Sequence, residues 1–125
     1  VLKTVISQIH EVKLGDAVGY NRGFVAEKPT RSATLPIGHA DGIGRLYGKG
    51  KGAVVIHGHK APILGNVCMD MTMCDVTSIS CSEEDEVIIF GDNPKVEELS
   101  QQINTIPYEI LTNISERVNR IFFQE

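Results

Sequence analysis

Residues 53–67 read AVVIHGHKAPILGNV, in which two short apolar runs flank a polar turn. Ala53 to Ile56 and Ala61 to Val67 predict β-strands, because Val and Ile favour extended structure and both runs are short. Between them lies His57-Gly58-His59, where a glycine permits a tight change of direction. This stretch therefore predicts short elements with the two-residue period of β-structure.

Further runs of this kind lie on both sides of the hairpin. The other predicted strands are Leu2 to Val12, Ala17 to Phe24, Ser32 to Ile37, Met69 to Val76 and Glu86 to Phe90. Lys28 to Arg31 and the acidic run Glu83 to Glu86 predict connecting loops, and Gly48 to Gly52 predicts an exposed hairpin tip. Gly38 to Gly44 has three glycines in seven residues, which predicts a loop without regular structure.

The pattern becomes helical after residue 92. Asn93 is predicted as an N-cap and Pro94 as the first helical residue. One helical face then carries the apolar residues Val96, Leu99 and Ile103. Pro107 predicts the start of a second short helix, and Arg117 to Phe123 predicts a last strand. Many short strands followed by one or two helices predict a mainly β fold, an antiparallel β-barrel.

The composition fits one compact domain over residues 1–125. The chain is 42% hydrophobic and 22% charged, enough apolar material for one core. Its formal charge of −4 disfavours binding to nucleic acid or to an acidic membrane surface. The longest apolar runs have four residues, far short of the roughly 18 that span a bilayer. Three cysteines without a CxxC motif disfavour a disulfide framework and a structural zinc site, and predict a cytoplasmic protein.

Four blocks carry a resemblance to a known family. They are Gly15 to Tyr20 (GDAVGY), Ala33 to Gly42 (ATLPIGHADG), Ala61 to Met71 (APILGNVCMDM), and Thr105 to Leu111 (TIPYEIL) leading to Arg117 to Arg120 (RVNR). In order and spacing they resemble the C-terminal domain of alanine racemase, a pyridoxal phosphate (PLP) enzyme. The resemblance implies a Greek-key β-barrel that follows a PLP-binding TIM-type barrel absent from this chain. Because the chain opens with Val inside a predicted strand, we expect it to be a fragment of a longer protein.

The resemblance implies an isomerase that interconverts L- and D-alanine for peptidoglycan synthesis in the bacterial cell wall. Tyr20 aligns with the family's catalytic tyrosine, the base that removes the Cα proton from L-alanine. A free phenol has a pKa of about 10 and is a poor base at neutral pH, so the missing barrel has to supply a stabilising network. From the residues alone, Tyr20 is an ordinary half-buried strand tyrosine.

Three further positions align with binding residues of the family. Met69 resembles the methionine whose backbone N–H holds the substrate carboxylate, while its side chain packs at a strand end. Asp70 beside it is expected to orient this substrate-binding loop. Tyr108 aligns with a tyrosine that hydrogen-bonds the PLP phosphate, and a phenol at a helix start suits an anion. The alternative for Tyr108 is packing at an edge of the core.

His39 departs from the family pattern, which is Gly-Tyr-Ala-Asp-Gly where this chain has Gly38-His39-Ala40-Asp41-Gly42. We expect His39 at the mouth of the substrate channel, where an imidazole donates a hydrogen bond and titrates near neutral pH. A histidine here resembles the subgroup fused behind a muramoyl-tripeptide:D-alanyl-D-alanine ligase. A solvated loop histidine is the alternative.

Other candidate motifs give weaker signals. His57 and His59 lack nearby partners in a zinc pattern, so a hairpin turn is favoured and no metal is expected. The glycines and lysines of residues 48–52 lack the order of a phosphate-binding loop. None of the seven lysines has the setting of a Schiff-base lysine. The fragment alone is thus expected to be inactive and without PLP.

The family places the tyrosine of one subunit against the PLP lysine of its partner, so the resemblance implies a homodimer. The expected partners are L- and D-alanine, the chain's own N-terminal barrel and a second subunit. A competing hypothesis is a non-catalytic small β-barrel that holds a partner protein through its loops. Absorption of bound PLP by the full-length protein distinguishes the two.

Overall fold

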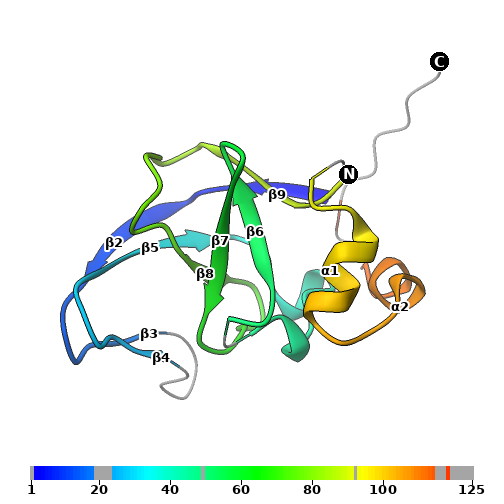
Figure 1. The fold of residues 1–125 in the computed structure, drawn as a ribbon, viewed down its shortest axis with the longest axis horizontal. Coiled ribbons are helices and arrows are strands. Elements are labelled where there is room, and N and C mark those ends of the chain that lie inside the picture. Colours follow the sequence, from blue (N-terminus) through cyan, green and yellow to red (C-terminus); the bar gives the residue numbers. More distant parts are fainter. Residues whose placement is uncertain (1, 19–23, 49, 92, 115–117, 119–125) are drawn as a thin grey trace.

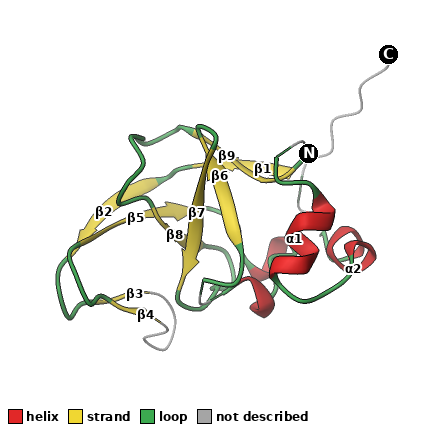
Figure 2. Ribbon diagram, in the orientation of Figure 1, coloured by secondary structure: helices red, strands yellow, loops and turns green. Residues whose placement is uncertain are grey.

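The computed structural model describes residues 2–18, 24–48, 50–91, 93–114 and 118. In these residues nine strands come first and two α-helices follow (Figures 1 and 2). The strands are β1 (Leu2–Val5), β2 (Gln8–Val12), β3 (Ala17–Val18), β4 (Phe24–Val25), β5 (Thr30–Leu35), β6 (Ala53–Ile56), β7 (His59–Leu64), β8 (Thr72–Asp75) and β9 (Glu86–Phe90). The helices are α1 (Val96–Gln102) and α2 (Pro107–Thr112), and the 3-10 helices η1 (His39–Asp41) and η2 (Arg45–Tyr47) lie between β5 and β6.

Seven of the strands form one antiparallel sheet in the order β1-β9-β6-β7-β8-β5-β2. β1 and β2 lie at opposite ends of this order, yet only Ile6 and Ser7 separate them in the chain. The connection spans at most about 10 Å, so the sheet has to curl until its edges approach each other. Ile6 N–H donates to the Asp85 carbonyl and Ser7 N–H donates to the Thr34 carbonyl, so the connection contacts both sides of the curl.

The predicted fold class is confirmed, because the fold is mainly β. Its antiparallel sheet curls into a half-barrel, and two short helices follow the sheet (Figure 2). The helices lie at one end of the half-barrel, away from the separate β3–β4 hairpin (Figure 1). Leu99, Ile103 and Ile110 from the helical segment are buried in the same core cluster as residues of the sheet. Neither helix in the described part of the chain is long and apolar enough to cross a membrane.

The β6–β7 hairpin forms where it was predicted. Its register pairs Ile56 with His59, so the loop has two residues, His57 and Gly58. Both have positive φ angles, 51° and 79°, which is typical of the turns that match the twist of a β-hairpin. His59 was predicted in the turn, but it is the first residue of β7.

Other predicted strand boundaries are wrong. The single strand predicted over Leu2 to Val12 is two strands, because the chain leaves β9 and joins β5 at Ile6-Ser7. β5 already begins at Thr30, inside the predicted loop. β8 begins only at Thr72, because the hydrogen bond from Cys68 N–H to the Met71 carbonyl closes a turn before it.

The glycine-rich segments also differ from their predictions. Gly38 to Gly44 was predicted without regular structure, but it contains η1. Gly48 and residues 50–52 follow η2 and precede β6, so they are not a hairpin tip between two strands; Gly50 and Lys51 are exposed, as predicted, whereas Gly48 and Gly52 are buried. Gly50 N–H donates to the Ile63 carbonyl, which ties this turn to β7.

The helix predictions are partly correct. α1 begins at Val96 with Lys95 at the N-cap, so the prediction of Asn93 as N-cap is wrong. Pro107 is the first residue of α2, as predicted. The strand predicted over Arg117 to Phe123 and residues 19–23 of the predicted strand Ala17 to Phe24 lie outside the described residues.

Candidate functional site

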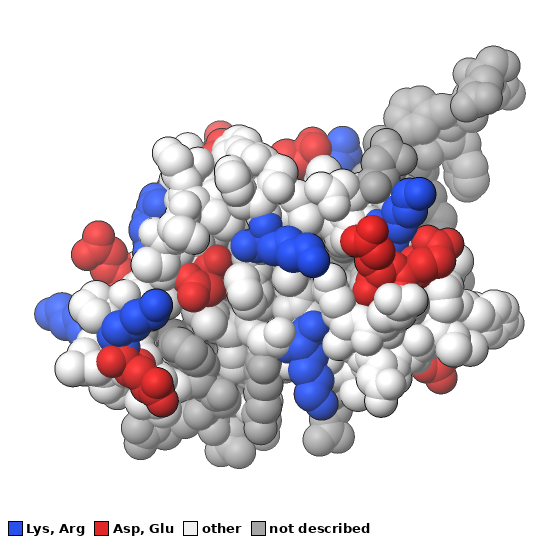
Figure 3. Space-filling model, viewed as in Figure 1, with Lys and Arg blue, Asp and Glu red and all other residues white. Residues whose placement is uncertain are grey.

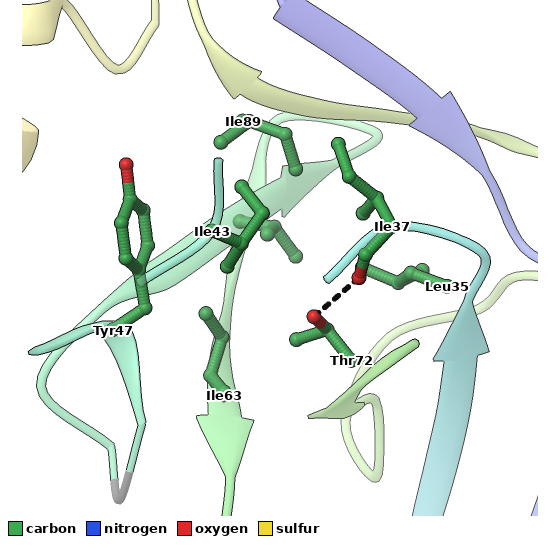
Figure 4. Close-up of a pocket in the computed structure, with 8 residues that line it drawn as sticks. Leu35, Ile37, Ile43, Tyr47, Ile63, Thr72 and Ile89 are labelled. Atoms are coloured by element: carbon green, nitrogen blue, oxygen red, sulfur yellow. Dashed lines mark hydrogen bonds between the residues drawn. The ribbon is translucent and has the colours of Figure 1, made fainter. Parts of the chain in front are cut away.

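The candidate site is built on two loops that lie against each other, residues 37–41 after β5 and residues 68–72, which lead into β8 and include its first residue. Ala40 N–H donates to the Met69 carbonyl at 2.8 Å. Thr72 Oγ1, which is buried, donates to the Ile37 carbonyl at 2.5 Å (Figure 4). These contacts join loops that are about thirty residues apart in the sequence. We call them the paired loops.

Gly38 allows the paired loops to approach so closely. A Cβ placed on Gly38 would lie 2.3 Å from the carbonyl oxygen of Cys68 and 2.8 Å from the amide nitrogen of Met71. The amide nitrogen of Asp70 would be 2.9 Å away. Real Cβ atoms do not come this close to backbone atoms, so this contact requires glycine.

Met69 lies at the outer side of the paired loops. The residue is 66% exposed, so the prediction that its side chain packs at a strand end is wrong. Its carbonyl is held by Ala40, whereas its amide N–H makes no hydrogen bond within the described residues. A backbone donor without a partner among the described residues, on a fixed loop, is suited to bind an anion.

The loop after η1 also contacts the end of α2. A Cβ on Gly42, whose φ is 109°, would lie 2.3 Å from the Asn113 carbonyl oxygen. Tyr108 lies on the same helix and is 71% exposed, so the alternative of packing at a core edge is wrong. Its hydroxyl donates to no other group in the described part of the chain. The structure therefore connects the loops of His39 and Met69 with the helix of Tyr108.

The structure describes the remaining predicted site residues only in part. The backbone of His39 opens η1, whereas its side chain is not among the described groups. Asp70 is exposed in the paired loops. Tyr20 lies outside the described residues. Sequence reasoning assigned no role to Gly38 or Thr72, although a glycine inside a compact turn is a signal of close backbone approach.

A surface groove is bordered by β3. The groove has a volume of about 390 Å³ and lies between β3 and the outer face of β2, β5 and β8. Ala17, three residues before Tyr20, and Met71, two residues after Met69, both line it. The hairpin that leads to Tyr20 and the loop of Met69 thus border the same groove.

The space beneath the paired loops is filled by apolar side chains. Ile37, Ile43 and Ile63 converge there, together with Tyr47 (Figure 4). The gap that remains is too small to hold a water molecule. Burial raises the pKa of Tyr47 to about 12, so this tyrosine stays protonated at neutral pH and is not a base.

Charges on the surface are mixed in sign. On the face drawn in Figure 3, basic side chains among the described residues are interspersed with acidic ones. His57 Nε2 lies 2.8 Å from Asp85 Oδ2, and this hydrogen bond together with that from Ser82 N–H lowers the pKa of Asp85. The pair connects the β6–β7 turn to the loop before β9, outside the paired loops.

The cysteines and histidines give no metal site in the described part of the chain, where no three His, Cys, Asp or Glu residues cluster. Cys68, Cys74 and Cys81 are free thiols. Burial raises the pKa of Cys74 to about 12 and also raises that of Cys81, so both thiols are protonated at neutral pH.

Known structures share this fold and define its class. The alanine racemase from Bartonella henselae, with covalently bound pyridoxal phosphate, is 36% identical and superimposes with a TM-score of 0.91 over 97% of this chain and 34% of its own. The biosynthetic alanine racemase from Pseudomonas aeruginosa is 31% identical, with a TM-score of 0.92 over 98% of this chain and 34% of its own. The half-barrel is therefore that of a domain found in alanine racemases.

The sequence comparisons identify the family. The model of the alanine racemase C-terminal domain matches residues 1–122. Alanine racemase 2 of Caldanaerobacter subterraneus subsp. tengcongensis is 42% identical over 125 residues, which cover 96% of this chain and 32% of that protein. The chain belongs to the alanine racemase C-terminal domain family, and it spans about a third of the length of the curated relatives it matches.

Proposed function

We propose that the full-length protein containing this chain, called the parent protein below, is a PLP-dependent alanine racemase that interconverts L- and D-alanine. The observation that carries the proposal is the Met69 amide N–H, which has no partner in the described residues and lies on a loop fixed by Ala40 and Gly38. This donor binds the alanine carboxylate, since a backbone N–H can hold an anion without a charged side chain. Family membership supports the same role.

Tyr20 is proposed as the base that takes the Cα proton from L-alanine at its phenolate oxygen. It returns the proton from the phenol Oη when the reaction runs from D- to L-alanine. The groove shared by Ala17 and Met71 supports this role, because it joins the hairpin leading to Tyr20 with the carboxylate-binding loop. Asp70 is proposed to orient that loop from its exposed position.

The described residues fit PLP through Tyr108. Its phenol is exposed near the start of α2 and makes no side-chain hydrogen bond in the described residues, so it can donate one to the cofactor phosphate. PLP, when bound, stabilises the negative charge that develops at Cα as the proton leaves. The lysine that holds PLP is proposed to lie in the N-terminal barrel, so this chain alone neither binds the cofactor nor racemises alanine.

The proposal includes a homodimer, in which this domain completes the PLP site of the partner subunit with Tyr20 and Met69. The D-alanine produced serves peptidoglycan synthesis in the cytoplasm. His39 is proposed to donate a hydrogen bond at the channel mouth, and it is the residue that supports a fusion to a muramoyl-tripeptide:D-alanyl-D-alanine ligase.

The experiment is to purify the parent protein and measure conversion of L- to D-alanine with and without added PLP. We expect turnover together with the visible absorption of bound PLP, whereas residues 1–125 alone should give neither. A parent protein without PLP absorption and without turnover would contradict the proposal and favour the non-catalytic binding module.

A further inference from the structure

Asp41 is a buried acid in the loop that lies against Met69. Only 9% of it is exposed. Its Oδ2 accepts the N–H of Gly38 at 3.0 Å, and its own N–H donates to the Gly38 carbonyl at 2.9 Å. Asp41 therefore holds both polar groups of Gly38, one with its side chain and one with its backbone.

The turn closed by Asp41 presents Ala40 to Met69. Ile43 N–H also donates to the Gly38 carbonyl, at 3.1 Å. Gly38 is therefore fixed by three hydrogen bonds. With Gly38 fixed, Ala40 N–H reaches the Met69 carbonyl at 2.8 Å. That bond orients the peptide after Met69 and thereby limits the directions in which the Met69 N–H points.

A buried carboxylate is costly unless its hydrogen bonds offset the loss of water. An apolar residue could fill the same space, but it could not accept the N–H of Gly38. The contacts of Asp41 with both polar groups of Gly38 connect it to the shape of the loop.

We propose that Asp41 is a positioning residue, which acts through Gly38 and Ala40 to aim the Met69 amide N–H at the substrate carboxylate. This inference rests on the proposed function and adds a residue that sets substrate affinity at that site. The carboxylate is bound in both the ground state and the transition state. Loss of Asp41 should thus weaken substrate binding and leave the proton transfer nearly unchanged.

The test is steady-state kinetics of Asp41→Ala in the PLP-bound parent protein. We expect the KM for L-alanine to rise by about tenfold while kcat stays within about threefold, as for loss of one uniform binding interaction. The Ki of propionate, which is alanine without the amino group, should rise by the same factor because it reports the carboxylate contact alone.

Asp75→Ala is the matched control. Like Asp41, Asp75 accepts a backbone N–H: that of Thr77, which lies 2.9 Å from Asp75 Oδ1. Asp75 is the last residue of β8, at the end of the strand opposite to the paired loops. A general loss of stability would raise KM in both variants, so the melting temperature of each variant is measured beside its KM. Only Asp41→Ala should change KM and the propionate Ki.

Asp41→Asn keeps an oxygen that can accept the Gly38 N–H, and it should retain a KM within about twofold of the wild type. If Asp41→Ala fails to fold, Asp41→Glu replaces it, because the longer side chain displaces the acceptor and should raise KM with kcat retained. The inference is overturned if Asp41→Ala leaves KM unchanged, or if Asp41→Asn is as impaired as Asp41→Ala. Failure of the proposed function is distinct, since the wild-type parent would then show no turnover.

Discussion

The paired loops and helix α2 both carry proposed binding residues, but they present them in opposite ways. In the paired loops the backbone makes the contacts, and Gly38 approaches Cys68 and Met71 too closely for any side chain. On α2 only Ile110 is buried, whereas Tyr108 and Leu111 are exposed. A site that uses a backbone N–H needs a fixed loop, whereas a site that uses a phenol needs only an accessible side chain. Substitutions in the loops should therefore affect stability as well as substrate binding, whereas substitutions of exposed side chains on the helix should affect affinity alone.

The largest effect on stability is expected for Gly38→Ala in the parent protein. The added Cβ would meet backbone atoms of Cys68, Asp70 and Met71, which cannot move without separating the paired loops. Such overpacking costs about 1–3 kcal/mol. Thermal unfolding should show a melting temperature lower by several degrees.

Gly44→Ala is the control for this change. A Cβ on Gly44 meets no atom within 4 Å, so its melting temperature should stay close to that of the wild type. Equal destabilisation by the two substitutions would show that the contact at Gly38 is not what holds the loops together.

Tyr108→Phe tests the helix side of the comparison. The hydroxyl is exposed and bonds to none of the described residues, so the melting temperature of the PLP-free protein should not change. Loss of a hydrogen bond to phosphate should weaken PLP binding by about tenfold, measured by absorbance titration. Tyr47→Phe removes a buried hydroxyl that has no hydrogen-bond partner among the described residues, and it should leave PLP affinity unaltered. Unchanged affinity in Tyr108→Phe would remove Tyr108 from the cofactor site.

The smallest effect is expected at the His57–Asp85 pair, which belongs to neither region. Hydrogen bonds from His57 and Ser82 lower the pKa of Asp85 in the folded state. Its contribution to stability is present above the unfolded pKa, about 3.9, and is lost as the pH falls through the lower folded value. The difference in unfolding free energy between wild type and Asp85→Asn should thus shrink only below about pH 4.

Both alanine KM and PLP affinity should be the same in Asp85→Asn as in the wild type. A difference in unfolding free energy that does not depend on pH would show that the pKa of Asp85 is not lowered by its hydrogen bonds.

Local patterns predicted the β6–β7 hairpin and the start of α2 at Pro107, because a two-residue turn and a helix-initiating proline are encoded by neighbouring residues. The break between β1 and β2 was missed, since the residues at Ile6-Ser7 look like those of one continuous strand. It arises from pairing with β9 on one side and β5 on the other.

The site was predicted through the family resemblance, and the structure adds what neighbouring residues do not encode. The contact of Gly38 with Cys68 joins segments that are thirty residues apart, and no local pattern specifies it. The exposure of Met69 was also mispredicted, because an apolar residue before a strand is normally expected to pack.

The central claim is that this domain supplies the base that acts on L-alanine. The most direct measurement is conversion of L- to D-alanine by Tyr20→Phe in the parent protein, with PLP content and melting temperature checked against the wild type. Removal of the phenol should lower the rate by at least about 100-fold, as for loss of a general base, while PLP and the fold are retained. An unchanged rate in the folded, PLP-bound variant would show that Tyr20 is not the base.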